Sequence, residues 1–338
     1  MARSTVRLKD IADRTGFSTN TVSLALRKSP RIPERTRELI QKAAAELNYL
    51  PNQIAKSLVS RETKTIGLIL TDINNPTLTH TAQAIELALA QLGYGTLFAT
   101  SNNALDQEIR AIELFRSRQV DGMLIYPSNH RQLEHIRPLR RAHYPVVLLV
   151  ADPDAGIDAV CIDDRRGAYK AVRHLIEIGH RRIGVIDSSL PLGNLEKLQG
   201  YQQALGEAGI DFDQSLAIDP EGHRTGSGYR AMDRLMQAKH RPSAVFAAND
   251  TLAIGALRWC QDNKVSVPGE MAIVGFDNIE YAEYAAVPLT TIDYAVDLLT
   301  GMAVDRLMGL IAAGDVLPEP RVTQIDPELI IRGSTQAP

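Results

Sequence analysis

Cysteines and long apolar runs are both scarce in this chain. Its 338 residues include only two cysteines, Cys161 and Cys260, which lie far apart in the sequence. Neither belongs to a paired spacing of the kind that binds zinc, so we expect two reduced thiols and no disulfide framework. The opening residues, MARSTVRLKD, lack the apolar stretch of a secretory signal, and no run approaches the roughly 20 apolar residues of a membrane span. These absences predict a cytoplasmic protein with no membrane partner.

Catalytic signatures are also missing. The sequence contains no glycine-lysine phosphate loop, no nucleophile elbow and no HExxH pair. Its eight histidines show no ligand spacing. Asp72 and Asp277 are candidates for an acid-base pair, but nothing in the sequence pushes their pKa values apart. We therefore predict that the protein is not an enzyme and has no catalytic residues, no cofactor and no metal site.

The net charge is small but unevenly distributed. The whole chain carries 37 Lys+Arg against 40 Asp+Glu, a formal net charge of -3. Residues 1–61 hold 12 of the basic and 5 of the acidic residues, which leaves 25 basic and 35 acidic residues for the remainder. A basic segment attracts phosphate backbones, and an acidic remainder is repelled by them. The first 61 residues are therefore the candidate nucleic-acid-binding region.

A helix-turn-helix pattern lies within this basic segment, at residues 8–27 (LKDIADRTGFSTNTVSLALR). Ala12, Gly16 and Val22 supply the small residue at the helix crossing, the glycine of the turn and the β-branched residue beneath the second helix. Ser18 stands where the second helix begins, and its hydroxyl is a cap for the free N–H groups there. The second helix of such a unit normally lies in the major groove of DNA.

The segment after this pattern predicts one more helix and then a linker. Pro33 opens a helical stretch with an apolar stripe at Leu39, Ala43 and Leu47, flanked by Ile40 and Ala44. Residues 51–62 are polar, yet they include enough apolar residues on one face for about two helical turns. A helix that short is unstable alone in water, so we expect it to order only against DNA or a second copy.

From residue 65 onward the pattern is that of an α/β protein. Short apolar runs alternate with amphipathic stretches; the runs are TIGLIL, GTLFA, GMLIY, PVVLLV, AVCI, RIGVI, SAVFAA and MAIVGF. Strands that are apolar throughout belong to parallel sheets covered by helices on both faces. The runs divide into an earlier group at 65–162 and a later group at 181–292, which predicts two doubly wound lobes around a cleft. The segment after Thr291 returns to helix, so we expect the chain to cross between the lobes more than once.

Polar residues follow several of these strands, where parallel sheets bind their ligands. Hydroxyls, amides and carboxylates of the kind that bind a polyol stand in four places: Thr71-Asp72, Tyr126 with Ser128, Asn249-Asp250 and Asp277-Asn278. For Asp72, Asp250 and Asn278 a helix cap or turn is an equal alternative. For Asn249 and Asp277 we favour ligand contact.

The chain resembles the LacI/GalR (lac repressor) family of transcription regulators from Leu8 to about Gly333. The resemblance is carried by LKDIADRTGFSTNTVSLAL, PNQIAKSL, IGLILTDINNP, HLIEIGHRRIGVI, FAANDTLAIGAL and IVGFDNIEYAEYAAVPLTTI. It implies a helix-turn-helix domain at 1–50, a hinge helix and linker at 51–62, and a periplasmic-binding-protein-like core at 63–338. The implied core has an N-subdomain at about 63–162 and 293–322 and a C-subdomain at about 163–292 and 323–334. The family acts as homodimers on near-palindromic operator DNA.

The resemblance also implies which residues contact DNA. Thr19, Asn20 and Leu24 match base-reading positions, and Leu24 departs from the arginine often found there, which exchanges a bidentate guanine contact for a contact with a thymine methyl. Backbone contacts are expected from Ser18, Thr21 and Ser23. Leu58 matches the hinge leucine that wedges between bases, with Asn52, Ala55 and Lys56 beside it in the minor groove. Packing within the linker is the alternative for Leu58.

The family's effector positions fall on residues of both lobes. They are Thr71, Asp72, Thr77, Leu78, Tyr126, Lys197, His223, Asn249 and Asp277, to which the strand-end pattern adds Ser128. Lys197 replaces a common arginine and loses its planar fork. His223 stands where some members place a stacking aromatic. Thr77-Leu78 replaces an aromatic pair, which favours a sugar-like ligand over a flat nucleobase.

These features predict a homodimeric repressor whose operator binding is controlled by a small sugar or sugar acid held between the lobes. Such control requires that the ligand bind one arrangement of the lobes better than the other. A sugar receptor of the periplasmic type, without a regulatory role, is the first alternative, and a sugar-modifying enzyme with a DNA-binding head is the second. The family includes members in which the ligand releases DNA and members in which it promotes binding, and the resemblance is compatible with both.

Overall fold

The computed structural model of the chain describes residues 6–50, 62–150, 155–188 and 194–336. The chain divides into two compact units, residues 1–63 and 64–338, which are called here the head and the core. The predicted hinge residues Asn52, Ala55, Lys56 and Leu58 lie outside the described residues. Their proposed contacts with DNA stay predictions.

The head forms the three helices that the sequence predicts: α1 (Leu8–Thr15), α2 (Thr19–Leu26) and α3 (Glu34–Glu46). Gly16 ends α1 with a φ of 75°, in the left-handed region that glycine adopts without strain, and its N–H donates to the carbonyl of Ala12. The side chain of Ser18 caps α2 by accepting from the Thr21 N–H. The turn between the first two helices is thus built by Gly16 and Ser18.

Side chains from all three helices form the hydrophobic core of the head. Ile11, Val22, Ala25 and Ile40 are fully buried, and Leu47 packs against them while partly buried. The predicted stripe on α3 is wrong in one member, because Leu39 is 49% exposed. Successive residues of a helix are rotated by about 100°, so the face that carries Ile40, Ala43 and Ala44 turns Leu39 toward solvent.

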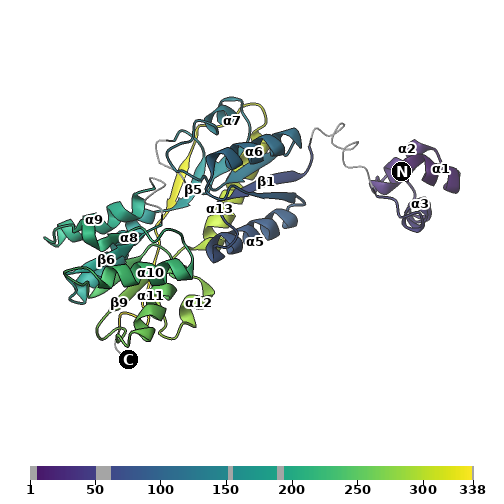
Figure 1. Cartoon of the computed structure of the whole chain (residues 1–338). Helices are drawn as coiled ribbons and strands as arrows, with labels where there is room; N and C mark the ends of the chain where they lie inside the picture. Colours follow the sequence, from purple (N-terminus) through teal and green to yellow (C-terminus); the bar gives the residue numbers. More distant parts are fainter. Residues whose placement is uncertain (1–5, 51–61, 151–154, 189–193, 337–338) are drawn as a thin grey trace. The chain divides into compact units, whose positions relative to one another are not determined.

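The core contains two six-stranded sheets, one in each lobe, which confirms the predicted fold class (Figure 1). In the first lobe the strand order is β11-β5-β4-β3-β1-β2. These strands span Thr65–Leu70 (β1), Gly95–Thr100 (β2), Gly122–Ile125 (β3), Val146–Leu148 (β4), Ala159–Ile162 (β5) and Val322–Ile325 (β11). All pairings in this sheet are parallel.

The sheet of the second lobe has the order β12-β10-β9-β8-β6-β7, parallel except for the pairing of β10 with β12. Its strands span Ile183–Ile186 (β6), Ala217–Ile218 (β7), Ala244–Ala247 (β8), Ala272–Asp277 (β9), Thr290–Asp293 (β10) and Leu329–Ile330 (β12). The eight apolar runs singled out in the sequence correspond to β1–β6, β8 and β9. The short strands β7, β10, β11 and β12 were not predicted.

Helices cover both faces of each sheet. In the first lobe they are α5 (Pro76–Gln91), α6 (Leu105–Ser117), α7 (Arg137–Arg141) and α13 (Val296–Ala313). In the second lobe they are α8 (Asp164–Glu177), α9 (Glu196–Glu207), α10 (Thr225–Met236), α11 (Asp250–Asp262) and α12 (Glu280–Glu283), with a short 3-10 helix at Gln214–Leu216. Leu68 of β1 packs with Leu89 of α5 and Leu307 of α13, whereas the neighbouring Ile69 packs with Phe115 of α6 on the opposite face. This is the doubly wound arrangement.

The chain crosses between the lobes more than once, as expected. After β10 in the second lobe it returns to the first lobe as α13 and β11, then re-enters the second lobe as β12 (Figure 1). The crossing expected after residue 322 falls later, because β11 pairs along its whole length with β5 of the first sheet. Residue 293, expected at the start of the returning segment, is instead the last residue of β10.

A close helix contact holds the second lobe together. Helices α8 and α9 cross at Gly200, where an added Cβ would lie 2.1 Å from the carbonyl oxygen of Arg165. Only glycine permits this approach. Among the described residues, no helix combines the length and the apolar character needed to cross a membrane.

Candidate DNA-binding helix and ligand cavity

Helix α2 presents an exposed polar surface at its start. Thr19 and Asn20 are exposed, whereas Val22 and Ala25 on the other side of the helix are buried in the core of the head. Ser18 is committed to its cap, since its Oγ accepts from the Thr21 N–H at 3.1 Å and lies 2.9 Å from Thr21 Oγ1. The predicted base-reading pair Thr19 and Asn20 is therefore available to DNA.

Leu24 and Ser23 lie between these two sides of α2. Both are half-buried, and Leu24 packs against the core of the head. Only part of the Leu24 side chain is left for contact with a thymine methyl. Its predicted role in base reading thus competes with a role in packing.

A cavity lies between the two lobes, at the carboxyl ends of their strands. All ten residues predicted to bind the effector line it: Thr71, Asp72, Thr77, Leu78, Tyr126, Ser128, Lys197, His223, Asn249 and Asp277. Residues that follow β1 and β3, together with residues of α5, form one side. Residues that follow β8 and the last residue of β9 form part of the other. The structure thus brings together segments as distant as residues 71 and 277, as expected for strand ends at a cleft.

The cavity also contains residues that the sequence reasoning missed. They are Asn75, Asn103, Pro127, His130, Asp164, Asp187, Ser188, Asn194, Glu196, Ala248 and Tyr294. Asp187 and Ser188 directly follow β6, so the strand-end rule would have found them. His130, Asn194 and Glu196 lie in loops or at a helix start, and no local pattern marks them.

For Asp250 and Asn278 the sequence left open a structural role or contact with a ligand, and their hydrogen bonds favour the structural role. Asp250 is fully buried and accepts from Thr291 Oγ1 at 2.6 Å and from the Ile279 N–H at 2.9 Å. Burial raises the pKa of Asp250 well above its usual range. Asn278 donates to Asp293 and accepts from Arg332. Neither residue lines the cavity, so both serve the structure of the second lobe.

Asn249 has both roles that the sequence left open. Its side chain caps α11 by accepting from the Leu252 N–H at 2.9 Å, and it also lines the cavity. The cap fixes the side chain at the end of β8, where a ligand would meet it.

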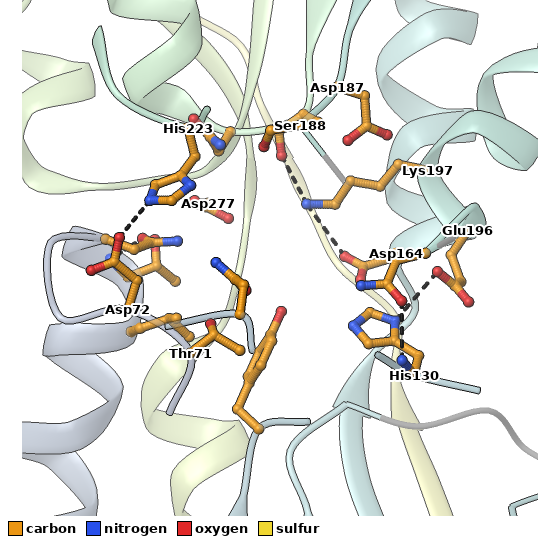
Figure 2. Close-up of a pocket in the computed structure, with 18 of the residues that line it drawn as sticks. Thr71, Asp72, His130, Asp164, Asp187, Ser188, Glu196, Lys197, His223 and Asp277 are labelled. Carbon is orange, nitrogen blue, oxygen red and sulfur yellow. Dashed lines mark hydrogen bonds and ion pairs between the residues drawn. The ribbon is translucent and has the colours of Figure 1, made fainter. Parts of the chain in front are cut away.

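Polar contacts join the two lobes across the cavity (Figure 2). His223 Nε2 of the second lobe lies 2.5 Å from Asp72 Oδ2 of the first. His130 Nδ1 of the first lobe lies 3.4 Å from Glu196 Oε2 of the second, and the His130 N–H donates to Asn194 Oδ1. Burial raises the pKa of Asp72, but hydrogen bonds from Asn74 and His223 outweigh it, so this pKa lies below its usual value. These contacts hold the lobes in one arrangement.

Lys197 replaces the common arginine with contacts of its own. Its ammonium donates to the Ala248 carbonyl at 2.8 Å, lies 3.8 Å from the centre of the Phe276 ring and 3.7 Å from Asp164 Oδ1 (Figure 2). Burial lowers the pKa of Lys197, but Asp164, Asp277 and Asp187 outweigh this and raise it above its usual value. Lys197 therefore stays charged in the cavity.

Two carboxyl groups of the cavity hold their protons more tightly than usual. Burial raises the pKa of Asp277 to about 7, although Lys197 opposes the shift. Burial also raises the pKa of Asp164, again against the effect of Lys197. Asp277 has a φ of 116°, a strained conformation for a residue with a side chain. Buried, strained and titratable groups of this kind concentrate at functional sites.

Ser128 is fixed by a buried carboxylate behind the cavity wall. Glu108 is fully buried and accepts from the Ser128 N–H at 2.6 Å and from its Oγ at 2.7 Å. His135 Nε2 lies 2.6 Å from the other oxygen of Glu108. In the part of the chain that the structure describes, no group of His, Cys, Asp and Glu is arranged to hold a metal ion.

Both the head and the core of the chain are similar to known protein families. Residues 7–52 match the model of the bacterial regulatory proteins of the lacI family, and residues 172–335 match that of the periplasmic binding protein-like domain. The transcriptional repressor PurR of Vibrio atlanticus (strain LGP32) is 31% identical over 334 residues, covering 97% of this chain and 98% of the relative. The transcriptional regulator DegA of Bacillus subtilis (strain 168) is 31% identical, covering 96% of this chain and 97% of the relative.

A solved structure extends this similarity to the three-dimensional level. The complex of the transcriptional regulator CelR with cellobiose is 29% identical, with a TM-score of 0.71, and the match covers 97% of this chain and 99% of that one. The relatives named above are transcription regulators and not enzymes. This chain therefore belongs to the LacI family of bacterial transcription regulators, with a helix-turn-helix head that binds DNA and a two-lobed core that binds an effector.

Proposed function

We propose that the protein is a homodimeric repressor of carbohydrate or sugar-acid catabolism genes, controlled by a sugar-like ligand bound between its lobes. The observation that carries this proposal is the cavity itself, whose lining comes from both lobes and is rich in hydroxyl, amide and carboxyl groups. Such groups hydrogen-bond a polyol from several sides at once.

The contacts across the cavity supply the coupling. Asp72 with His223 and His130 with Glu196 hold the lobes in one arrangement. A ligand that inserts between these residues favours the lobe arrangement with which it makes more contacts, and only that differential affinity shifts the population. The hinge between head and core then transmits the change to the two heads of a dimer on a near-palindromic operator.

The relatives support a repressor with a sugar-like ligand without deciding the ligand. PurR is named a repressor, and CelR is solved with cellobiose. The position of Thr77 and Leu78 at the cavity, where an aromatic pair would stack on a flat ring, favours a sugar over a nucleobase. The proposal is based on the residues of the cavity, because the same fold serves many different functions.

The test combines a ligand screen with an operator-binding measurement. An operator is first selected from random DNA with the full-length protein. Its binding is then followed by fluorescence anisotropy in the presence of sugars, sugar acids, sugar phosphates and nucleobases. We expect one sugar-like ligand to change operator affinity, and Asp277→Ala to keep that affinity but lose the response. Glu319→Gln is the matched control, because Glu319 is exposed and does not line the cavity.

Three results would contradict the proposal. A response to nucleobases alone would place the ligand in another class. The absence of any ligand response, with intact operator binding, would remove the regulatory role of the cavity. If Asp277→Ala abolished both functions, Asp277 would be a structural residue and the cavity assignment would lose its main support.

A further inference from the structure

The charges that line the cavity do not balance. Five carboxyl groups line it: Asp72, Asp164, Asp187, Glu196 and Asp277. Among the described residues that line the cavity, the basic side chains are one lysine, Lys197, and two histidines, His130 and His223, with no arginine. The lining therefore has an excess of acidic groups.

The basic side chains of the lining already face carboxyl groups. His223 lies against Asp72 and His130 against Glu196. Lys197 lies 3.7 Å from Asp164, and no hydrogen-bond donor of the described residues reaches the buried Oδ1 atom of Asp164. The described lining thus has five carboxyl groups against one lysine and two histidines. Asp164 and Asp277 are both stabilised by the single ammonium of Lys197, so the lining is short of positive charge beside these two groups.

This imbalance discriminates between classes of ligand. A carboxylate or phosphate would enter a buried site that repels it, and like charges at short range are strongly unfavourable where water is excluded. Ionised carboxylates only accept hydrogen bonds, whereas an ammonium group only donates them. A ligand with several hydroxyls and one ammonium group therefore complements the lining in both charge and hydrogen bonding.

The titration of the acidic groups agrees with a shortage of positive charge. Burial raises the pKa values of Asp277 and Asp164, and Lys197 compensates only in part. A second cation beside these groups would stabilise both carboxylates.

Building on the proposed function, we propose that the effector is an amine-bearing sugar whose ammonium group binds beside Asp277 and Asp164, and that sugar acids and sugar phosphates are excluded. This assignment narrows the sugar-like class to its cationic members. It also gives the acidic lining a function in selecting the ligand.

The experiment compares matched sets of ligands on the full-length protein by isothermal titration calorimetry. Each set has one hexose skeleton, in the gluco, galacto or manno configuration, presented as the 2-amino sugar, its N-acetyl derivative, the neutral hexose and the uronic acid. We expect one amino sugar to bind at least about tenfold more tightly than its N-acetyl and neutral counterparts, a difference of about 1.4 kcal/mol, and the uronic acids not to bind.

A charge-neutral variant locates the selectivity. Asp277→Asn keeps the size of the side chain, and we expect it to weaken amino-sugar binding while reducing the preference over the neutral hexose by about tenfold. Glu319→Gln, which removes an exposed carboxylate elsewhere in the first lobe, should keep the full preference. Thermal unfolding of Asp277→Asn checks that the variant is folded.

The outcomes separate this inference from the proposed function. Binding of a neutral hexose or a uronic acid as tightly as the amino sugar would overturn the charge assignment and leave a sugar-responsive regulator. An unchanged preference in a folded Asp277→Asn would also overturn it. Failure of every sugar in every set would overturn both proposals.

Discussion

The DNA-reading surface and the ligand cavity are built in opposite ways. On the head, the predicted base-reading residues Thr19 and Asn20 are adjacent on the exposed side of α2, away from the side that packs in the core of the head. Leu24 is the predicted base-reading residue that also packs. In the core, the cavity collects residues from position 71 to position 294, and several of them also hold the fold. Asn249, for example, both caps a helix and lines the cavity. Substitutions should therefore separate function from stability on the head more readily than in the core.

The largest expected change in stability comes from the contact between α8 and α9 in the core. Gly200→Ala should lower the free energy of unfolding of the core by about 3 kcal/mol, because its Cβ would lie 2.1 Å from the carbonyl oxygen of Arg165. Gly206→Ala on the same helix meets nothing within 4 Å and should raise stability by roughly 0.5 to 1 kcal/mol. Urea unfolding of the full chain measures both. Equal effects of the two variants would show that the close contact is absent.

Asp277 predicts a dependence of core stability on pH. Its pKa is about 7 in the folded protein, against about 3.9 in an unfolded chain. The folded state therefore retains a proton between these values, so this contribution is full below about pH 4 and is lost as the pH rises through 7. Asp277→Asn removes this titrating group. Between pH 5 and 7, the free energy of unfolding of the variant should therefore fall by about 2 kcal/mol less than that of the unmodified protein.

Asp72 provides the matched control for this effect. Its pKa is lowered, so its contribution is present above the ordinary value of about 3.9 and is lost at lower pH. Asp72→Asn should therefore leave the change between pH 5 and 7 as it is in the unmodified protein. Urea unfolding at the two pH values decides the matter, and parallel profiles for Asp277→Asn and the unmodified protein would contradict the raised pKa.

The sequence was sufficient for the strands but not for every part of the sheets. Seven of the eight predicted strands are buried along nearly their whole length, so their apolar composition alone gives a signal. The eighth, β2, lies at the edge of its sheet and is largely exposed, but its apolar run was still recognised. Strand β10 was missed although it is buried, because three of the four residues in its sequence TTID are polar. Strand β11 is only partly buried and reads VTQI. Such strands form because the sheet offers a partner, and that information is not local.

The residues of the cavity were likewise predictable from the sequence only in part. The strand-end rule and the family resemblance placed ten lining residues, because the carboxyl ends of parallel strands meet at one edge of a sheet. His130 and Glu196 escaped both, since they meet only when the two lobes approach each other. The acidic excess of the lining was equally hidden, because it depends on which side chains converge and not on the composition of any one segment.

On the head, Asn20 should affect DNA binding without affecting the core. Its exposed amide is suited to a bidentate contact with adenine, so Asn20→Ala should weaken binding to the selected operator by roughly 1 to 3 kcal/mol. Gln41→Ala, which removes an amide from α3, should have little effect. Fluorescence anisotropy gives the affinities, and calorimetry with the effector should give the same value for both variants. If Asn20→Ala weakened binding equally to all DNA sequences, Asn20 would contact the DNA backbone and not a base.

The cap of α2 gives the smallest effect and the most local one. Ser18→Ala removes the acceptor for the Thr21 N–H and should destabilise the helix by about 1 kcal/mol. Because the head and the core are separate compact units, faster hydrogen exchange should be confined to peptides that cover residues 19–26, with the core unchanged. Thr15→Ala, which removes a hydroxyl bonded to the Ile11 carbonyl within α1, is the matched control. Exchange that rose throughout the core would show that the two units are energetically coupled, and the contrast between head and core would then fail.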